Sequence, residues 1–399
     1  MARLGDVFPL IRNGVSIKQI DGAGGLPITR IETIANRVVD RSRMGYANII
    51  DNDRYAEYQL QDGDILMSHI NSEKHLGKVA RYKSNANEYI IHGMNLLVLR
   101  VDRQIMMSEY AEYFFNSDSF LRQIPNITKK SVNQASFNIS SLRELFIPIP
   151  QLDQQREVVH ILDGVCALIS LRKQQLAKLD ELVKARFVEL FGDPIDNPKG
   201  LPVKTLKELS TLITNGNTPK GGSENYVDKG ILFLRSQNVW RNRIELDDVA
   251  YIDEATHHSL KKSSLKHKDI LITKTGRINT ENSSLGRAAL YLGEDDSANI
   301  NGHVYLIRLD GSVVPEYVVT ILTSEAYRKY IRKVCVGGID KRQINLDQVE
   351  DFPIILPSVD LQEQFAAFVE QTDKSKLAVQ QSIDQLETLK KSLMQKYFG

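Results

Sequence analysis

The segment FIPIPQLDQQ at residues 146–155 returns as PIILPSVDLQ at residues 353–362. Pro150 thereby pairs with Pro357, 207 residues further along the chain. The same spacing holds downstream, where the LFG that follows the first copy is matched by YFG at residues 397–399. Self-similarity at a fixed spacing is typical of a duplicated architecture. The sequence therefore predicts one structural unit present twice.

The repeat also extends upstream of these segments, with small shifts in spacing that loop insertions explain. RLGDVFPLIRNG, from Arg3, resembles TLKELSTLITNG, from Thr205, and GDILMS at residues 63–68 resembles KDILIT at residues 268–273. Between the copies, GDPIDNPKGLP at residues 192–202 is rich in glycine, proline and turn-forming residues and is expected to be a linker.

Each copy mixes two kinds of pattern. Short apolar runs such as GILFL, DILIT and NLLVLRV predict strands, whereas EYAEYFFNSDSFLRQI and PEYVVTILTSEAYRKYI place apolar groups every three or four residues, as amphipathic helices do. The predicted fold class is α+β, with two mixed α/β domains in tandem repeat, each followed by a long α-helix. The expected domain boundaries are 1–150 for the first domain, 151–193 for a central helix, 194–356 for the linker and second domain, and 357–399 for a C-terminal helix.

The two long helices carry apolar stripes that step by threes and fours over roughly 40 residues, or about 60 Å of continuous helix. Two matched stripes in one chain can bury their apolar faces against each other, although each stripe could instead pack on its own domain. We expect the first arrangement, an antiparallel coiled coil. The residues expected to pair the helices are Val165, Ile169, Leu176, Leu179, Val183, Phe187, Val379, Ile383, Leu386 and Leu393.

Composition excludes several classes of protein. The net charge of +1 provides no global basic field, and charged residues make up 25% of the chain, as in an ordinary globular protein. Neither a signal-peptide pattern nor an apolar run of about 20 residues is present, so we expect a cytoplasmic protein without a membrane partner. Cys166 and Cys335 are the only cysteines and cannot form a disulfide framework.

The sequence contains no recognisable catalytic motif. GxxxxGK[ST], GxGxxG after a strand, HExxH and GxSxG are all missing, and no acidic or amide residue precedes a Pro-Pro-aromatic motif of the amino-methyltransferase kind. His257, His258 and His267 lie near Asp253 and Glu254, but adjacent histidines point in different directions and the carboxylates are poorly spaced for a metal. We therefore expect no catalytic residue, no metal and no cofactor on this chain.

The pattern of a domain ending in φPxPxLxxQ, a long helix closing in LFG, and then the whole unit again resembles the specificity (S) subunit of Type I restriction–modification systems. The most specific stretches are residues 148–155 with their echo at 356–362, ITNGNTPKGG at 213–222 and GGIDKRQINLDQVEDFPI at 337–354. In the first copy the last two elements read NGVSIKQIDGAGG and TKKSVNQASFNI.

The resemblance implies a division of labour. Each domain is a target recognition domain that reads one half of a bipartite double-stranded DNA sequence, and the paired helices fix the spacer between the halves. The helices also dock two modification (methyltransferase) subunits, and restriction/motor subunits complete the assembly. S-adenosylmethionine, ATP and Mg are then expected on those partner subunits, whose complex is an adenine-specific DNA methyltransferase and ATP-dependent endonuclease.

Candidate DNA-reading residues follow predicted strands at matched places in both copies. Arg reads guanine, Asn and Gln read adenine, and Lys and Arg bind phosphate. In the first copy the candidates are Arg30, Ser68, His69, Asn71, Lys129, Lys130, Asn133 and Gln134; in the second they are Arg235, Gln237, Asn238, Trp240, Arg241, Arg243, Lys274, Thr275, Arg277, Asn279, Lys341, Arg342 and Gln343.

Two other functions fit parts of the pattern. A duplicated protein-interaction adaptor without DNA binding explains the near-zero net charge equally well, but only a DNA reader selects a discontinuous consensus from random duplexes. A stand-alone enzyme with an unrecognised site would methylate DNA alone when given S-adenosylmethionine.

Overall fold

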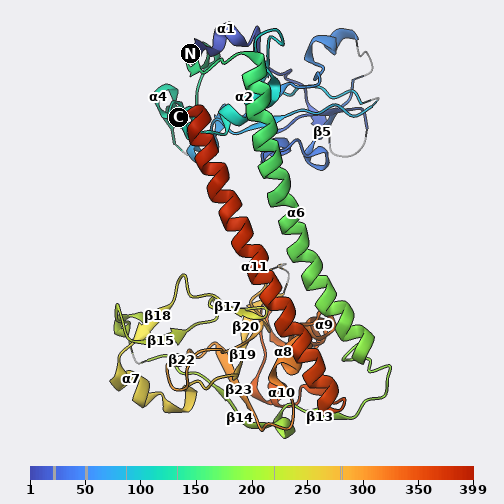
Figure 1. Ribbon diagram of the computed structural model, residues 1–399, viewed down its shortest axis with the longest axis vertical. Helices are drawn as coiled ribbons and strands as arrows, with labels where there is room; N and C mark the ends of the chain where they lie inside the picture. Colours follow the sequence, from blue (N-terminus) through green and yellow to red (C-terminus); the bar gives the residue numbers. More distant parts are fainter. Residues whose placement is uncertain are drawn as a thin grey trace. The chain divides into compact units, whose positions relative to one another are not determined.

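The chain forms two compact units in the computed structural model, which describes residues 1–20, 24–49, 53–86, 88–132, 134–219, 221–278, 280 and 282–399. Unit 1 comprises Met1–Lys173 and Gln380–Gly399, and unit 2 comprises Gln174–Val379. The helices α6 (Leu152–Phe191) and α11 (Val359–Phe398) each contribute residues to both units (Figure 1).

Unit 1 is built around an antiparallel sheet with the strand order β2-β9-β6-β8, on which α2 packs its buried aromatic face. Its elements are β1 (Ala2–Arg3), α1 (Leu4–Val7), β2 (Leu10–Asn13), β3 (Gln19–Ile20), β4 (Leu26–Ile28), η1 (Ile31–Ile34), η2 (Arg41–Arg43), β5 (Gly45–Ala47), η3 (Asp53–Tyr58), β6 (Ile65–Met67), β7 (Ile70–Asn71), η4 (Glu73–His75), β8 (Val79–Arg81), β9 (Leu97–Arg100), α2 (Ser108–Phe115), α3 (Asp118–Leu121), α4 (Ile124–Ile127), β10 (Lys129–Ser131), β11 (Gln134–Ser136), α5 (Ile139–Arg143) and β12 (Phe146–Ile147).

Unit 2 repeats this plan with the sheet order β14-β23-β19-β21, covered by α8 and α9. Its elements are β13 (Val203–Thr205), η5 (Lys207–Leu209), β14 (Ser210–Asn215), η6 (Gly222–Asn225), β15 (Ile231–Leu234), β16 (Val239–Trp240), β17 (Arg243–Ile244), β18 (Ala250–Ile252), α7 (Glu254–Ser259), η7 (Lys261–Ser263), β19 (Ile270–Thr273), β20 (Thr275–Arg277), β21 (Ala288–Leu290), β22 (Ala298–Ile300), β23 (Val304–Leu309), α8 (Pro315–Thr323), α9 (Glu325–Val334), β24 (Val336–Gly337), β25 (Lys341–Gln343), α10 (Leu346–Glu350) and β26 (Pro353–Ile355).

A buried ion pair holds the central sheet of each unit. The GDILMS segment places Asp64, which is 1% exposed, 2.7 Å from the guanidinium of Arg100 on β9. The KDILIT segment places Asp269, which is 2% exposed, 2.7 Å from Arg308 on β23. Because a buried carboxylate is costly without a partner, each arginine is needed where its strand passes the aspartate of the neighbouring strand. The sequence similarity between the segments is therefore a similarity of packing.

The glutamine that ends each φPxPxLxxQ segment attaches a long helix to its domain. Gln155 is fully buried; its side-chain oxygen accepts from the Met107 N–H at 2.9 Å, and its amide donates to the Pro150 carbonyl at 2.9 Å. Gln362 repeats both bonds, to the Val314 N–H at 3.0 Å and the Pro357 carbonyl at 2.9 Å. The motif thus fixes where each helix begins.

The two long helices run antiparallel beside each other within each unit (Figure 1). In unit 1 the first half of α6 shares a core with the end of α11, where Phe398 contacts Tyr110, and Lys173 pairs with Glu387 at 2.9 Å. In unit 2 the second half of α6 meets the start of α11, where Phe187 and Phe365 pack edge to face. The predicted fold class, two mixed domains each followed by a long helix with the helices paired antiparallel, is confirmed.

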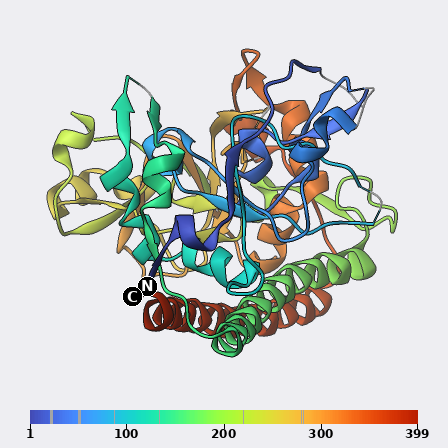
Figure 2. The same ribbon diagram turned by 90° about the horizontal axis from the view of Figure 1, so that it is seen from above.

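The residues expected to pair the helices are all at least half-buried: Val165, Ile169, Phe187, Val379 and Ile383 are buried, and Leu176, Leu179, Val183, Leu386 and Leu393 are half-buried. Their individual contributions to pairing remain predictions. The chain ends both lie in unit 1, on the same side of it (Figure 2), where Arg122 donates to the Gly399 carbonyl at 2.7 Å. In the part of the chain that the structure describes, no helix is apolar over a length that would cross a bilayer.

Candidate nucleic-acid interface

The first cluster of unit 2 lies directly after β15 and is organised by one exposed carboxylate. Asp248 accepts from the Arg235 guanidinium at 3.0 Å and from the Gln237 amide at 2.5 Å. Asn238 is only 2% exposed, and its side chain bonds to the Arg235 N–H and to the carbonyls of Glu245 and Asp248. Asn238 therefore shapes the loop that presents Arg235 and Gln237.

Trp240 forms the centre of an arginine cluster on the β16–β17 hairpin. The guanidinium of Arg287 stacks 3.8 Å from the centroid of its ring, and that of Arg243 lies 5.2 Å away. Arg287 is 8% exposed, donating to the carbonyls of Ser283 at 3.0 Å and Asn282 at 2.5 Å. Burial, together with the positive charge of Arg241 and Arg243, lowers the pKa of Arg287. Arg243 also pairs with Glu245 at 2.7 Å. The fold thus gathers arginines around an aromatic face, a combination that suits nucleic acid.

A second cluster of unit 2 is assembled by strand pairing. β20 pairs with β25 so that Thr275 lies opposite Gln343 and Arg277 opposite Lys341, although the segments are far apart in sequence. Arg277 forms an ion pair with Asp340 at 3.3 Å, and both side chains are more than 60% exposed. The two clusters meet at a hollow of about 360 Å³, lined by Ser236, Gln237, Trp240, Arg277, Thr280, Asn282, Ser283, Ser284 and Arg287.

Unit 1 builds the equivalent sheet from β7, β11 and β10. Asn71 lies opposite Ala135, which brings the segment after β6 next to the hairpin that carries Lys129 and Lys130. Both lysines are exposed, and Lys130 pairs with Glu73 at 2.7 Å.

Ser68 and His69 lie beneath this surface, at 2% and 5% exposed. Burial lowers the pKa of His69 to about 4, so its imidazole is neutral at physiological pH. His69 also packs edge-on against Phe137. The two side chains support the sheet in this conformation, whereas Asn71 and Gln134 remain accessible.

The other candidates occupy varied positions. Arg30 lies at the start of η1, away in sequence from the hairpin, with its N–H donating to Thr33. Lys274 is half-buried with its ammonium 5.6 Å from the Tyr305 ring. Asn133 and Asn279 lie outside the described residues.

Sequence reasoning missed Arg287. The signal was a weak one: GRAA at residues 286–289 echoes GKVA at 77–80, and both glycines adopt positive φ before a buried strand. An arginine next to a glycine reads as a solvated turn residue, and only the fold brings it against Trp240.

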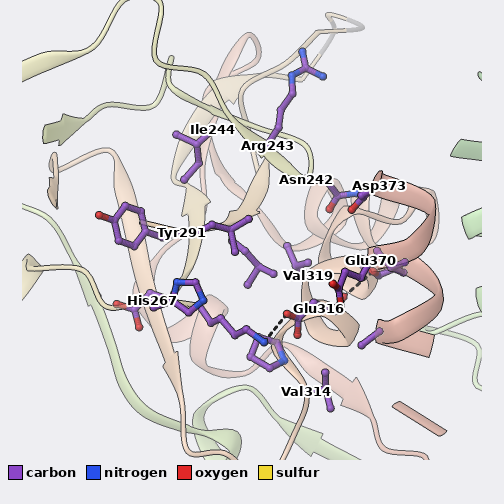
Figure 3. A pocket seen from close by; sticks show the side chains of 18 of the residues that line it. Asn242, Arg243, Ile244, His267, Tyr291, Val314, Glu316, Val319, Glu370 and Asp373 are labelled. Carbon is purple, nitrogen blue, oxygen red and sulfur yellow. Dashed lines mark hydrogen bonds and ion pairs between the residues drawn. The ribbon is translucent and has the colours of Figure 1, made fainter. Parts of the chain in front are cut away.

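A wide groove of about 1700 Å³ runs along α11 in unit 2 (Figure 3). Its lining combines apolar residues such as Ile244 and Val319 with the ion pairs Lys268–Glu316 at 2.9 Å and Lys374–Glu370 at 2.7 Å. Within the described ranges no group of three or more histidine, cysteine or acidic side chains is arranged to hold a metal. His257 instead hydrogen-bonds Asn299 at 2.6 Å.

Comparisons with known proteins agree with this geometry. The family described as "Type I restriction modification DNA specificity domain" matches residues 1–181. The putative type I restriction enzyme MjaX specificity subunit of Methanocaldococcus jannaschii is 30% identical over 98% of this chain and 90% of its own length. This chain belongs to the type I restriction–modification specificity subunits.

Solved structures agree on the fold of the specificity subunit. The type I S subunit from M. genitalium matches with a TM-score of 0.56 and 14% identity, covering 100% of this chain and 95% of that one. A chain from a study of complex assembly and conformational transition of the type I R-M system matches with a TM-score of 0.59 and 16% identity, covering 100% and 96%. The chain is a DNA-sequence recognition subunit and not itself an enzyme, so the adaptor and stand-alone enzyme alternatives are not favoured.

Proposed function

We propose that each unit reads one half of a bipartite double-stranded DNA target through its hairpin sheet and the neighbouring loops. The observation that carries this is the repeated construction: strand pairing brings basic and amide side chains together at β10–β11–β7 and at β24–β25–β20. Arg235, Gln237, Arg241, Arg243, Lys274, Thr275, Arg277, Lys341, Arg342 and Gln343 are the proposed contacts in unit 2, and Asn71, Lys129, Lys130 and Gln134 are those in unit 1. We assign Ser68, His69 and Asn238 a supporting role because they are buried.

We further propose that the functional segments are the first domain at 1–150, the central helix at 151–193, the linker and second domain at 194–356, and the C-terminal helix at 357–399. The helix pair then fixes the length of DNA between the two half-sites. Each helix has 40 residues. Inserting one helical turn into both helices adds about 5.4 Å, which is one or two base pairs at about 3.4 Å each.

Two modification subunits are the proposed helix partners. The support is another repeated feature: Leu182 and Leu389 are 207 residues apart, and both are exposed, at 48% and 46%. Exposed apolar side chains at matched positions suit two copies of one partner. S-adenosylmethionine, ATP and Mg are proposed to belong to the modification and restriction/motor subunits.

The test is to express this chain with modification subunits and map methylated adenines on a host genome lacking other systems. A bipartite consensus with a fixed spacer is expected. Swapping residues 194–356 for the same region of another specificity subunit should change one half of the consensus and leave the other unchanged. A continuous consensus, or a change in both halves, contradicts the proposal.

A further inference from the structure

The two most exposed large apolar side chains that the structure describes occupy the same place in the two copies. Val132 is 91% exposed between β10 and β11, and Ile339 is 88% exposed between β24 and β25. They are 207 residues apart, the spacing of the repeat. Single exposed aliphatic residues are common on protein surfaces, but two extremes at equivalent positions call for a shared reason.

The hairpins that carry these residues are firmly attached to their units. Beyond each tip, a strand leads to a buried side chain, Phe137 in unit 1 and Ile344 in unit 2. An asparagine then caps the next helix: Asn138 accepts from the Ser141 N–H at 2.7 Å, and Asn345 forms a capping box with Gln348. Each aliphatic tip is therefore held on a fixed support.

Among the described residues, charged side chains lie close to both tips in the sequence. Lys130 beside Val132 pairs with Glu73 at 2.7 Å, and Asp340 beside Ile339 pairs with Arg277 at 3.3 Å. Lys341 and Arg342 follow Ile339 on β25. An aliphatic side chain gains by leaving water only if its partner is apolar, while the basic neighbours favour a partner that is anionic at its edge.

The base stack of DNA combines an apolar interior with anionic phosphates on either side. We propose that Val132 and Ile339 are wedges, each entering a base step of its half-site while the neighbouring basic side chains hold phosphates. Aliphatic wedges that unstack a step and bend the duplex are a known way for proteins to use such residues. The proposal rests on the proposed DNA-reading function and adds the residues that deform the DNA.

The test uses the assembled methyltransferase and a duplex carrying its mapped target. Ile339→Ser and Val132→Ser should each weaken binding by about tenfold, the amount expected when one aliphatic side chain is no longer buried. Wedging costs least at a step that is already unstacked. An abasic site or mismatch at the contacted step should therefore strengthen wild-type binding and reduce the difference between wild type and variant.

Matched controls are Val203→Ser in unit 2 and Val38→Ser in unit 1, which remove exposed aliphatic residues (51% and 59%) outside the hairpins and should leave affinity unchanged. Unchanged affinity of both tip variants overturns the wedge. The wedge is also overturned if the loss of affinity disappears when thymine is replaced by uracil, since that identifies a methyl contact in the groove. It is overturned as well if the variants fail to assemble the complex in the absence of DNA. If the wild-type complex shows no sequence-specific binding, the DNA-reading function fails instead.

Discussion

Units 1 and 2 share a frame but differ in the residues they present at their surfaces. The buried Asp–Arg pair, the glutamine at the start of each long helix and the hairpin sheet occur in both. At the surface, unit 2 has arginines around Trp240, whereas unit 1 has Arg12 stacked 4.1 Å from the Tyr58 ring. Unit 1 also buries two histidines, His69 and His92. The comparison teaches that the two copies share their buried support and differ in their exposed side chains, a difference that the proposed reading of two different half-sites would use.

The largest expected effects test the buried Asp–Arg pairs that both units share. Arg100→Ala in unit 1 and Arg308→Ala in unit 2 each leave a buried aspartate unpaired, and each should lower the free energy of unfolding by about 3 kcal/mol. Urea unfolding measures the loss. Arg3→Ala breaks an ion pair whose side chains are 56% and 62% exposed and should change stability by under about 1 kcal/mol. Clearly unequal losses for Arg100→Ala and Arg308→Ala would show that the two frames are not equivalent.

A second prediction separates the units by pH. Burial lowers the pKa of His92 to about 3 and that of His69 to about 4, well below the ordinary 6.5. The neutral forms are favoured by folding, so this stability is complete above pH 6.5 and is lost as the pH falls toward 4. In unit 2, the residue that corresponds to His92 is Asn301, shortly before β23. Unit 1 should therefore lose a few kcal/mol more than unit 2 between pH 7 and pH 4.5.

The single tryptophan makes this measurable, because Trp240 reports only on unit 2. At pH 7 the urea transitions followed by Trp240 fluorescence and by circular dichroism should lie close together. At pH 4.5 the circular dichroism transition should begin at lower urea, and His92→Asn should reduce that separation. Coincident transitions at both pH values would remove the histidines as a source of difference.

A third prediction concerns the arginine cluster of unit 2. Arg287→Ala removes the stack on Trp240 and the bonds to the 282–283 carbonyls, so the loop and the Trp240 face lose their arrangement. We expect DNA affinity to fall by about tenfold, or 1.4 kcal/mol. The matched variant Lys78→Ala in unit 1 should change affinity by less than about twofold. Equal losses would mean that the two surfaces read DNA in the same way.

How much of this could be predicted from sequence depends on the range of the interaction. The repeat, the long helices and the strands before the candidate residues are local patterns, and they predicted the fold class. The hollow between Trp240 and Arg277 depends on β20 pairing with β25, a contact between segments far apart in the chain. The local pattern also could not predict burial. Nothing in the Ser68-His69 dipeptide distinguishes a buried His69 from one that is accessible to DNA. Residue type indicated the chemistry, and only tertiary packing decided which side chains are accessible.

The smallest expected effect compares the basic residues of the two hairpins. Removing one phosphate-binding side chain should reduce the slope of log affinity against log salt by about 0.9. Lys341→Ala with Arg342→Ala should therefore flatten the slope by up to about 2. Lys129→Ala with Lys130→Ala should flatten it less, because Lys130 already pairs with Glu73 at 2.7 Å and must exchange that carboxylate for a phosphate. Glu73→Gln alone should then free Lys130, so that a gel-shift titration of this single variant gives a steeper slope than wild type. An unchanged slope in the Lys341/Arg342 double variant would remove that hairpin from the interface.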